Sequence, residues 1–479
     1  MSSSKDYKRR SIISTISLFV QSGYSALLGL VANLVVTILL SPNVYGIYIT
    51  VLSMIAFLNY FSDVGLAASL IQKKEITDRD TATTFTFQQA LIITLIGIGF
   101  LLTPFVISFY RLPVEGQYLY WALLGSFFIS SLKTIPSVLL ERQMHFKKLV
   151  LVQIVENTIF YAVVIGAALG GFGLRSFTYA VVARAIIGVI LLYSISFWRI
   201  RIGFHLPSFK ELIRFGLPYQ GVSFLALFKD DLMTLYLGRA IGFEALGYVG
   251  WAKKWADAPL RIIMDNISRV AFPLISRFQD QRNKIDSIIK NILSYQTMVI
   301  APIMIGAALT MPSAIDIIPR YAKWEPAVPL FAVFSVSSLI ISLGVPYMNL
   351  YNAAGRVKVT FTFMAIMTTT IWSVTAFLIP INSLWAFPIA HLITSTSLLF
   401  IQIKAKRDFN TNALSHVTPY LLSALLMGLV IWGVQQYVST TGIINVALNV
   451  AVGGATYILL LVGLFKINIV SSLKKLHAI

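Results

Sequence analysis

The segment VPLFAVFSVSSLIISLGVPYMNL, residues 328–350, contains no charged side chain, and runs of this kind decide the fold class. About 20 predominantly apolar residues are enough to cross the hydrocarbon core of a bilayer as a helix. Comparable runs recur almost from end to end of the 479 residues, which are 57% hydrophobic and 12% charged. A soluble protein has roughly 25% charged residues. The sequence therefore predicts an all-α polytopic membrane protein.

Hydropathy predicts 14 transmembrane helices. They cover residues 14–40, 44–71, 85–109, 118–140, 149–171, 177–198, 212–237, 246–275, 288–311, 328–350, 359–379, 384–403, 417–438 and 443–465. The connections between them are too short to hold a soluble domain. The first run is too long for the apolar part of a signal peptide and lacks an Ala-x-Ala site, so we expect it to be retained as a helix.

Lysine and arginine are distributed unevenly between the two sets of loops. With the N-terminus in the cytoplasm, the cytoplasmic segments hold 26 of the 38 lysines and arginines, and the opposite loops hold 5. An excess of this size marks cytoplasmic loops, so both termini are expected in the cytoplasm. The same distribution explains the formal charge of +19, because cations at membrane level meet anionic lipid headgroups. The basic composition therefore requires no nucleic-acid partner.

Residues 1–205 and 206–408 resemble two copies of one six-helix unit. Each copy begins with a basic segment and has an aromatic–glycine turn after its first helix, SPNVYGIY at 41–48 and GFEALGYV at 242–249. Because six is even, both copies have the same orientation, which predicts two parallel six-helix lobes with a central cleft. Residues 409–479 form an additional C-terminal helix pair.

Eleven charged residues lie between positions 224 and 272, in sequence that otherwise predicts two membrane spans. Lys229, Asp230 and Asp231 interrupt the first of these spans. In the second, charges of alternating sign at 253, 257, 261, 265 and 269 follow one another at i, i+4 spacing, which places them in a winding row along one helix. Pro259 removes one backbone hydrogen bond within the row and predicts a kink or hinge.

Ionisable side chains within a membrane are costly, so they usually face a bundle interior or a wet cavity. The cations expected to bind an anionic headgroup are Lys133, Arg184, Lys229, Lys253, Lys254 and Arg261. The carboxylates expected to couple transport to an ion, or to form ion pairs, are Asp63, Glu156, Asp230, Asp231, Asp257 and Asp265. The spans contain seven cations and six carboxylates, so their net charge favours an anion only weakly. The alternative is a self-neutralised row that only fixes helix packing.

Several of these groups have a more specific expectation. Glu156 can form an ion pair with Lys133 or with Arg184, since buried charges are normally paired. Asp63 lies near the end of the second span and can sit at the cytoplasmic interface. Within the charged stretch, the cations expected to remain uncommitted and to meet the headgroup are Lys253, Lys254 and Arg261.

The residue types argue against an enzyme or a metalloprotein. Cysteine is absent, and the five histidines are scattered without ligand spacing, which argues against thiolate chemistry and metal ligation. No GxxxxGK[ST] loop occurs, so ATP hydrolysis by a P-loop is not expected. We therefore expect no catalytic residues, no cofactor and no metal.

Three stretches resemble sequences of one transporter family. They are DVGLAASLIQKKEI at 63–76, ERQMHFKKL at 141–149 and RVAFPLISRFQD at 269–280. Together with the length and the 6+6+2 arrangement, they resemble the polysaccharide or lipid-linked oligosaccharide flippases of the MOP exporter superfamily, in particular the colanic-acid exporter branch of the Wzx family. These stretches indicate a class and not a particular substrate.

The resemblance implies a flippase that moves a polyprenyl-diphosphate-linked oligosaccharide, a repeat unit of O-antigen (lipopolysaccharide), capsule or exopolysaccharide, across the bacterial cytoplasmic membrane by alternating access. The diphosphate would pair with Lys or Arg in the cleft while the lipid tail stays in the bilayer. A glycan polymerase or chain-length regulator is an implied partner. Two alternatives stay open. One is a cation-coupled multidrug exporter of the same superfamily, with twelve spans and acidic residues in its first span. The other is a non-transporting membrane partner of a glycan polymerase.

Overall fold

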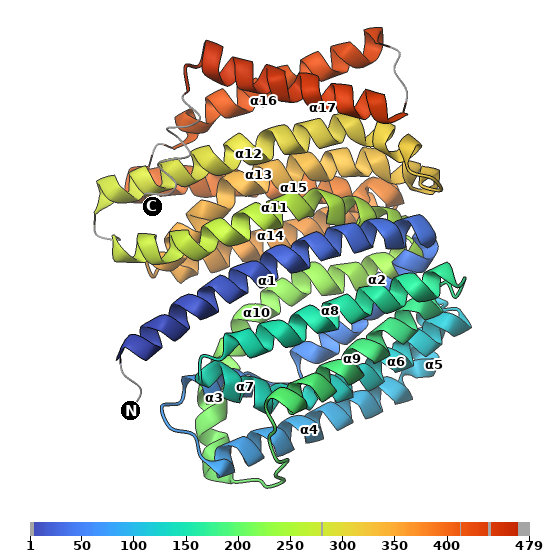
Figure 1. Cartoon of the computed structure of the whole chain (residues 1–479), viewed down its shortest axis with the longest axis vertical. Coiled ribbons are helices and arrows are strands. Elements are labelled where there is room, and N and C mark those ends of the chain that lie inside the picture. Colours follow the sequence, from blue (N-terminus) through green and yellow to red (C-terminus); the bar gives the residue numbers. More distant parts are fainter. Residues whose placement is uncertain (1–3, 279–280, 412, 439–441, 468–479) are drawn as a thin grey trace. The chain divides into compact units, whose positions relative to one another are not determined.

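The computed structural model describes residues 4–278, 281–411, 413–438 and 442–467. At some helical positions only the backbone is described, and these include residues 4–20, Asp265 and Arg269. All regular elements among the described residues are helices (Figure 1). The predicted all-α class is therefore confirmed.

The helices pack into two compact units, Met1–Gly247 and Tyr248–Ile479. The first contains α1 (Ser4–Leu39), α2 (Pro42–Tyr60), α3 (Leu66–Gln72), α4 (Asp78–Leu101), α5 (Thr103–Tyr110), α6 (Val114–Ser131), α7 (Thr134–Arg142), α8 (Phe146–Leu169), α9 (Arg175–Ile195) and α10 (Leu206–Ala240). After α11 (Phe243–Arg277), which begins in the first unit, the second contains α12 (Arg282–Ile317), η1 (Ala322–Ala327), α13 (Val328–Ala353), α14 (Val357–Leu378), α15 (Ser383–Phe409), α16 (Leu414–Tyr437), α17 (Gly442–Leu459) and η2 (Leu460–Leu464). This division does not test the repeat boundaries after residues 205 and 408, which stay predictions.

Within the described residues, ten helices are long and apolar enough to cross a membrane, and the bent pair α6–α7 makes an eleventh if it is one span. Helices α1, α10 and α11 have 36, 35 and 35 residues, which is also long enough. However, α1 is described only in part, and the other two carry the charged stretch. Large apolar side chains lie exposed on the spans, for example Leu101 at 82% and Leu429 at 63%, as expected of surfaces that face lipid. The number of fourteen spans stays a prediction.

The bend between α6 and α7 has a local cause. The two helices meet at 42°, and Pro136 lies in the first turn of α7. A proline ring clashes with the carbonyl group four positions earlier and has no N–H to donate. That carbonyl belongs to Leu132, so α6 ends at Ser131 and α7 begins at Thr134. The break leaves Lys133 between the helices, inside the predicted fourth span.

The two aromatic–glycine turns lie against each other within the first unit. A Cβ atom on Gly46 would lie 1.7 Å from the carbonyl oxygen of Phe243, and one on Gly247 would lie 2.0 Å from that of Pro42. In both turns the glycine follows the contacted residue by four positions, so the approach is reciprocal. Only glycine allows backbones to approach this closely. A two-fold relation of this kind is what two parallel repeats would produce.

The second unit has an apolar and an aromatic zone of buried side chains. The apolar zone lies among α12, α13, α15 and α16 and includes Tyr347 and Leu398. In the aromatic zone, Trp251 stacks on Trp324 at a centroid distance of 5.6 Å and donates to Tyr321 Oη at 2.8 Å. This zone packs the start of α11, the helix that carries the charged row, against η1.

Candidate functional site

Four helices of the first unit line a cavity of ≈ 420 Å³. They are α2, α6, α8 and α9, and the charged residues of the lining are Lys133, Glu156 and Arg184. Three predicted site residues that are far apart in sequence therefore meet at one place. Ligand-binding pockets usually have volumes of roughly 300–1,000 Å³, so the cavity is large enough for the headgroup of a ligand.

Lys133 donates to the carboxylate of Glu156, which decides between the two predicted pairings of this carboxylate. The two side chains are only 18% and 8% exposed. Burying two charges is costly, and their attraction offsets this cost only when the geometry is good. On α9, a Cβ atom at Gly188 would lie 1.8 Å from Glu156 Oε1. Glycine at this position therefore leaves the room that the pair needs.

Arg184 is the second cation of the cavity lining and does not take part in the Lys133–Glu156 ion pair. It lies one turn before Gly188 on α9, is exposed, and forms no ion pair with any residue that the structure describes. Its guanidinium carbon lies 5.9 Å from the centre of the Phe160 ring, a favourable distance for a cation–π contact. A guanidinium group presents N–H donors in a planar fork that matches phosphate oxygens. The lining therefore has a net charge of +1, placed on the group best suited to bind a phosphate.

The uncharged part of the lining was not predicted. It includes Asn59, Ser126 and Ser130, and the hydroxyl oxygen of Ser126 is buried without a hydrogen-bond partner among the described residues. Tyr48 also lines the cavity and stacks on Phe177 at a centroid distance of 3.8 Å. Serine, asparagine and tyrosine are common in membrane helices, so no sequence signal distinguished these residues. Together they supply hydrogen-bonding groups around Arg184.

The charged cluster on α10 forms a separate polar group in the first unit. Lys229 Nζ lies 3.4 Å from Asp230 Oδ1, and Asp230 is 58% exposed. Asp231 accepts a hydrogen bond from Ser53 on α2. None of these three charged residues is part of the cavity lining around Arg184. Their roles in headgroup binding or ion coupling stay predictions.

On α11 the structure brings together only part of the predicted row. Lys253 donates to Asp257, and Ser338 on α13 donates to the other oxygen of the same carboxylate at 3.2 Å. The expectation that Lys253 is uncommitted is therefore wrong, because the i, i+4 spacing puts it in reach of Asp257. No ion pair joins the described side chains of Asp257 and Arg261. Lys254 and Arg261 are both exposed.

Two further predictions on α11 are not decided. The side chain of Asp265 lies outside the described part of the structure. The helix continues through Pro259 without interruption, and a hinge there stays a prediction.

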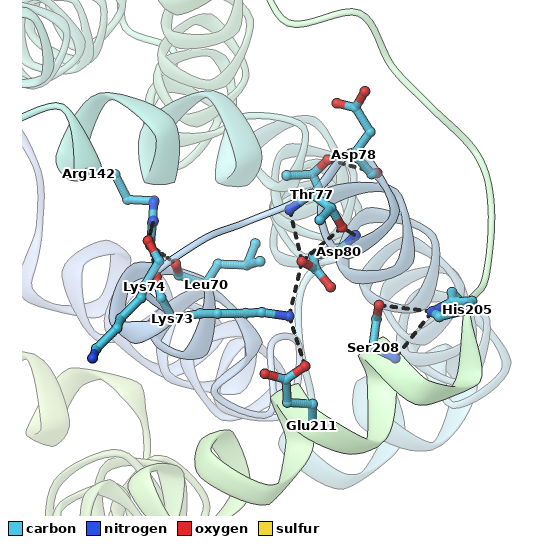
Figure 2. A network of polar contacts seen from close by, with 11 residues as sticks. Leu70, Lys73, Lys74, Thr77, Asp78, Asp80, Arg142, His205, Ser208 and Glu211 are labelled. Carbon is cyan, nitrogen blue, oxygen red and sulfur yellow. Dashed lines mark hydrogen bonds and ion pairs between the residues drawn. The ribbon is translucent and has the colours of Figure 1, made fainter. Parts of the chain in front are cut away.

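Two of the three family-like stretches meet at one end of the first unit (Figure 2). Arg142, from the stretch 141–149, donates to four backbone carbonyl groups at the end of α3. These belong to Leu70, Ile71, Lys73 and Lys74, from the stretch 63–76. Carbonyl groups at a helix C-terminus have no intrahelical partner, and a cation there also interacts favourably with the helix dipole. Arg142 therefore completes the end of α3.

The stretch 63–76 also contains the residues that stabilise the start of α3 and that connect α3 to other helices. Asp63 accepts from the N–H of Ala67 at 3.0 and 3.2 Å. Lys73 Nζ lies 3.1 Å from Asp80 Oδ2 on α4 and 2.8 Å from Glu211 Oε2 on α10 (Figure 2). The hydrogen bond that Lys73 donates to the carboxylate of Glu211 raises the pKa of Lys73 above its ordinary value. These residues thus connect α3 to α4, α7 and α10. Because their contacts stabilise the fold, the stretches 63–76 and 141–149 indicate a class of protein and not a substrate.

The arrangement of helices defines the class of the protein. The fold resembles the solved structure of the lipid II flippase MurJ in an inward closed conformation, with a TM-score of 0.72, 16% identity and coverage of 95% of this chain and 99% of that chain. It also resembles an inward-facing multidrug resistance transporter of the MATE family, of the MOP superfamily, with a TM-score of 0.60, 13% identity and coverage of 78% and 94%. The chain is a multi-pass membrane protein with the MOP-type fold.

Sequence comparison then identifies the family. A family model described as polysaccharide biosynthesis protein matches residues 35–329, more than half of the chain. The teichuronic acid biosynthesis protein TuaB of Bacillus subtilis is 24% identical over 426 residues, 84% of each chain. The lipopolysaccharide biosynthesis protein WzxC of Escherichia coli is 24% identical over 349 residues, 70% of this chain and 68% of that one. The chain belongs to the polysaccharide biosynthesis protein family, and the resemblance found in the sequence is confirmed.

Proposed function

We propose that the protein is a flippase that carries a polyprenyl-diphosphate-linked oligosaccharide across the bacterial cytoplasmic membrane by alternating access. The observation that carries this proposal is Arg184, a cation inside a membrane-spanning unit that lines a cavity and has no ionic partner among the described residues. The names of the relatives, which refer to teichuronic acid and lipopolysaccharide biosynthesis, support a glycan as the substrate. The MurJ-like fold supports a lipid-linked form of it.

In this mechanism Arg184 binds the diphosphate through paired N–H···O bonds. Ser126 and Asn59 supply further donors, and the lipid tail remains outside the cavity in the bilayer. A unit charge 4 Å from Arg184 would gain about 4 kcal/mol at an effective dielectric constant of about 20. Because Glu156 neutralises Lys133, Arg184 alone attracts the anion with an uncompensated charge. A second uncompensated cation would bind the anion more tightly and slow its release. A transport site has to bind its cargo strongly enough to admit it and weakly enough to let it leave.

In the second unit we assign Lys254 and Arg261 to the same substrate, since both are exposed on α11. Glu156 and Asp257 each form an ion pair with a lysine. A proton or Na⁺ that bound to either carboxylate would compete with that lysine, so we assign the coupling of transport to an ion to these two carboxylates. We place both termini in the cytoplasm, on the side of the cation-rich loops. A glycan polymerase or chain-length regulator would then receive the product on the opposite side.

The described part of α1 does not favour the multidrug-exporter alternative. Its polar side chains are amides and hydroxyls, and those nearest its described start contact α8. Gln21 donates to Gln153, and Ser25 accepts from Asn157 at 3.4 Å. An exporter that exchanges a drug for a cation is expected to have carboxylates in this span, and residues 14–40 contain none.

The test is the binding and translocation of a lipid-linked oligosaccharide by the reconstituted protein, with Arg184→Gln as the variant. Loss of a charge-assisted hydrogen bond costs about 1.5–3 kcal/mol, so we expect binding to weaken at least tenfold and translocation to slow. The matched control is Arg175→Gln on the same helix, because Arg175 is 47% exposed and pairs with Glu115 at 3.4 Å. Unchanged binding by a folded Arg184→Gln variant would remove this cavity from the substrate path.

A further inference from the structure

A second cavity of the first unit, of ≈ 660 Å³, lies apart from the one around Arg184. Its walls are the start of α4 and residues 199–205, which belong to the segment 197–205 that connects α9 to α10 without regular secondary structure. No described residue lines both cavities. The second cavity lies at the same end of the unit as the Arg142 network, where Figure 2 shows Asp78 and His205. This is the end that the positive-inside pattern assigns to the cytoplasm.

The lining of this cavity is basic. It contains Arg79, Arg199 and Arg201, and its one carboxylate, that of Asp78, pairs with Arg201. Arg79 and Arg199 are exposed and form no ion pair within the described ranges. With His205 neutral, the lining has a net charge of +2. Two arginines are thus available for an anion.

Apolar side chains alternate with these arginines along the segment 197–205. Ile200, Ile202 and Phe204 are 48%, 84% and 54% exposed, and all three line the cavity. Full burial of such a side chain is worth about 1.5–3 kcal/mol, so their exposure to water would be unfavourable. Apolar residues next to cations at the end of membrane helices are typical of segments that lie in the lipid headgroup layer.

The segment is held to α4, so the exposure of its apolar side chains is a feature of the fold. The N–H of Gly203 donates to Thr86 Oγ1 at 2.9 Å, and the N–H of His205 donates to Thr83 Oγ1 at 3.0 Å. The ion pair between Arg201 and Asp78 adds a third connection. The backbone is therefore fixed while the apolar side chains point away from the protein core.

We propose that this cavity binds the phosphodiester headgroup of an anionic phospholipid from the cytoplasmic leaflet. Arg79 and Arg199 bind the phosphate, and Ile200, Ile202 and Phe204 contact the acyl chains. A soluble phosphate compound would use the arginines but would leave the apolar side chains in water, so a lipid fits the whole surface. Occupancy would hold the start of α10 at the membrane surface. The site does not depend on the proposed transport of a glycan and requires only a membrane protein.

The test is native mass spectrometry of the full chain in detergent, with either anionic phosphatidylglycerol or zwitterionic phosphatidylethanolamine added. We expect the protein to retain one phosphatidylglycerol molecule in preference to phosphatidylethanolamine. The double variant Arg79→Gln/Arg199→Gln should bind it more weakly, by roughly fivefold for each arginine. The matched control is Lys210→Gln/Arg214→Gln, which removes the same charge from exposed positions of α10 outside the cavity. Its effect should stay below about twofold.

Two further measurements separate a lipid from a soluble phosphate. The variant Ile202→Ser should weaken phosphatidylglycerol retention, and glycerol 3-phosphate should not displace the lipid. Complete displacement by glycerol 3-phosphate, with no effect of Ile202→Ser, would assign the site to a soluble phosphate and overturn the proposal. Equal losses in the two double variants would also overturn it, because they would show only a general attraction to surface charge.

Discussion

The buried ion pair between Lys133 and Glu156 leads to a quantitative prediction. Its side chains are 18% and 8% exposed, so removal of one partner leaves the other charge with little water. Breaking a buried pair in this way costs about 3–5 kcal/mol. Since the pair borders a cavity, we expect the lower end, about 3 kcal/mol, for Lys133→Met and for Glu156→Met. The double variant should lie within about 1 kcal/mol of the wild type, because apolar replacement of both partners is often neutral or stabilising.

The assay is reversible unfolding of the purified protein in mixed micelles, with the free energy of unfolding measured for all four members of the cycle. Arg184→Met is the control, since it removes an exposed cation that has no ion pair with the described part of the chain and should cost less than about 1 kcal/mol. The reasoning is refuted if the double variant loses as much as the two single variants together. It is also refuted if each single variant stays within about 1 kcal/mol of the wild type. A stable double variant that does not translocate substrate would place the pair in the transport path.

Two other predictions concern the packing of the first unit. Gly46→Ala should lower the free energy of unfolding by about 3 kcal/mol, because its Cβ would lie 1.7 Å from a backbone oxygen that cannot move aside. Gly125→Ala, with nothing within 4 Å, should be neutral or slightly stabilising, and equal melting temperatures for the two variants would contradict this account. Asp80→Asn should cost about 2 kcal/mol because the carboxylate is 1% exposed and accepts charge-assisted bonds, whereas Glu211→Gln, at 61% exposed, should cost less than about 1 kcal/mol. The reverse order of melting temperatures would show that burial does not set the strength of this network.

Much of the candidate site was visible in the sequence for one physical reason. Ionisable residues are rare in membrane spans because they are costly there, so Lys133, Glu156 and Arg184 stand out by type and position. The contact between Lys253 and Asp257 was equally accessible, since it needs only helical spacing. Uncharged residues such as Ser126 carry no comparable signal, and no pattern predicted them.

The sequence could not decide which charges are left over. Glu156 had two possible partners, and the choice depends on the break that Pro136 causes and on the close packing of α8 and α9 at Gly188. The stretch between residues 224 and 272 has the highest density of intramembrane charge. Even so, the cavity that Arg184 lines is formed by α2, α6, α8 and α9, which precede this stretch in the chain. Arg184 forms no ion pair with any described residue.

The sequence by itself determined the class of the protein. It also predicted the two sets of loops, and helical spacing alone brings Lys253 within reach of Asp257. Hydropathy, loop charge and i, i+4 spacing depend on composition or on neighbours within one turn, so they need no knowledge of packing. The tertiary structure alone decided that Arg184 forms no ion pair with any described residue while Lys133 is neutralised, and that Arg142 completes the end of α3. These outcomes depend on distances between helices far apart in the chain, which are set by packing and by the backbone breaks that precede it.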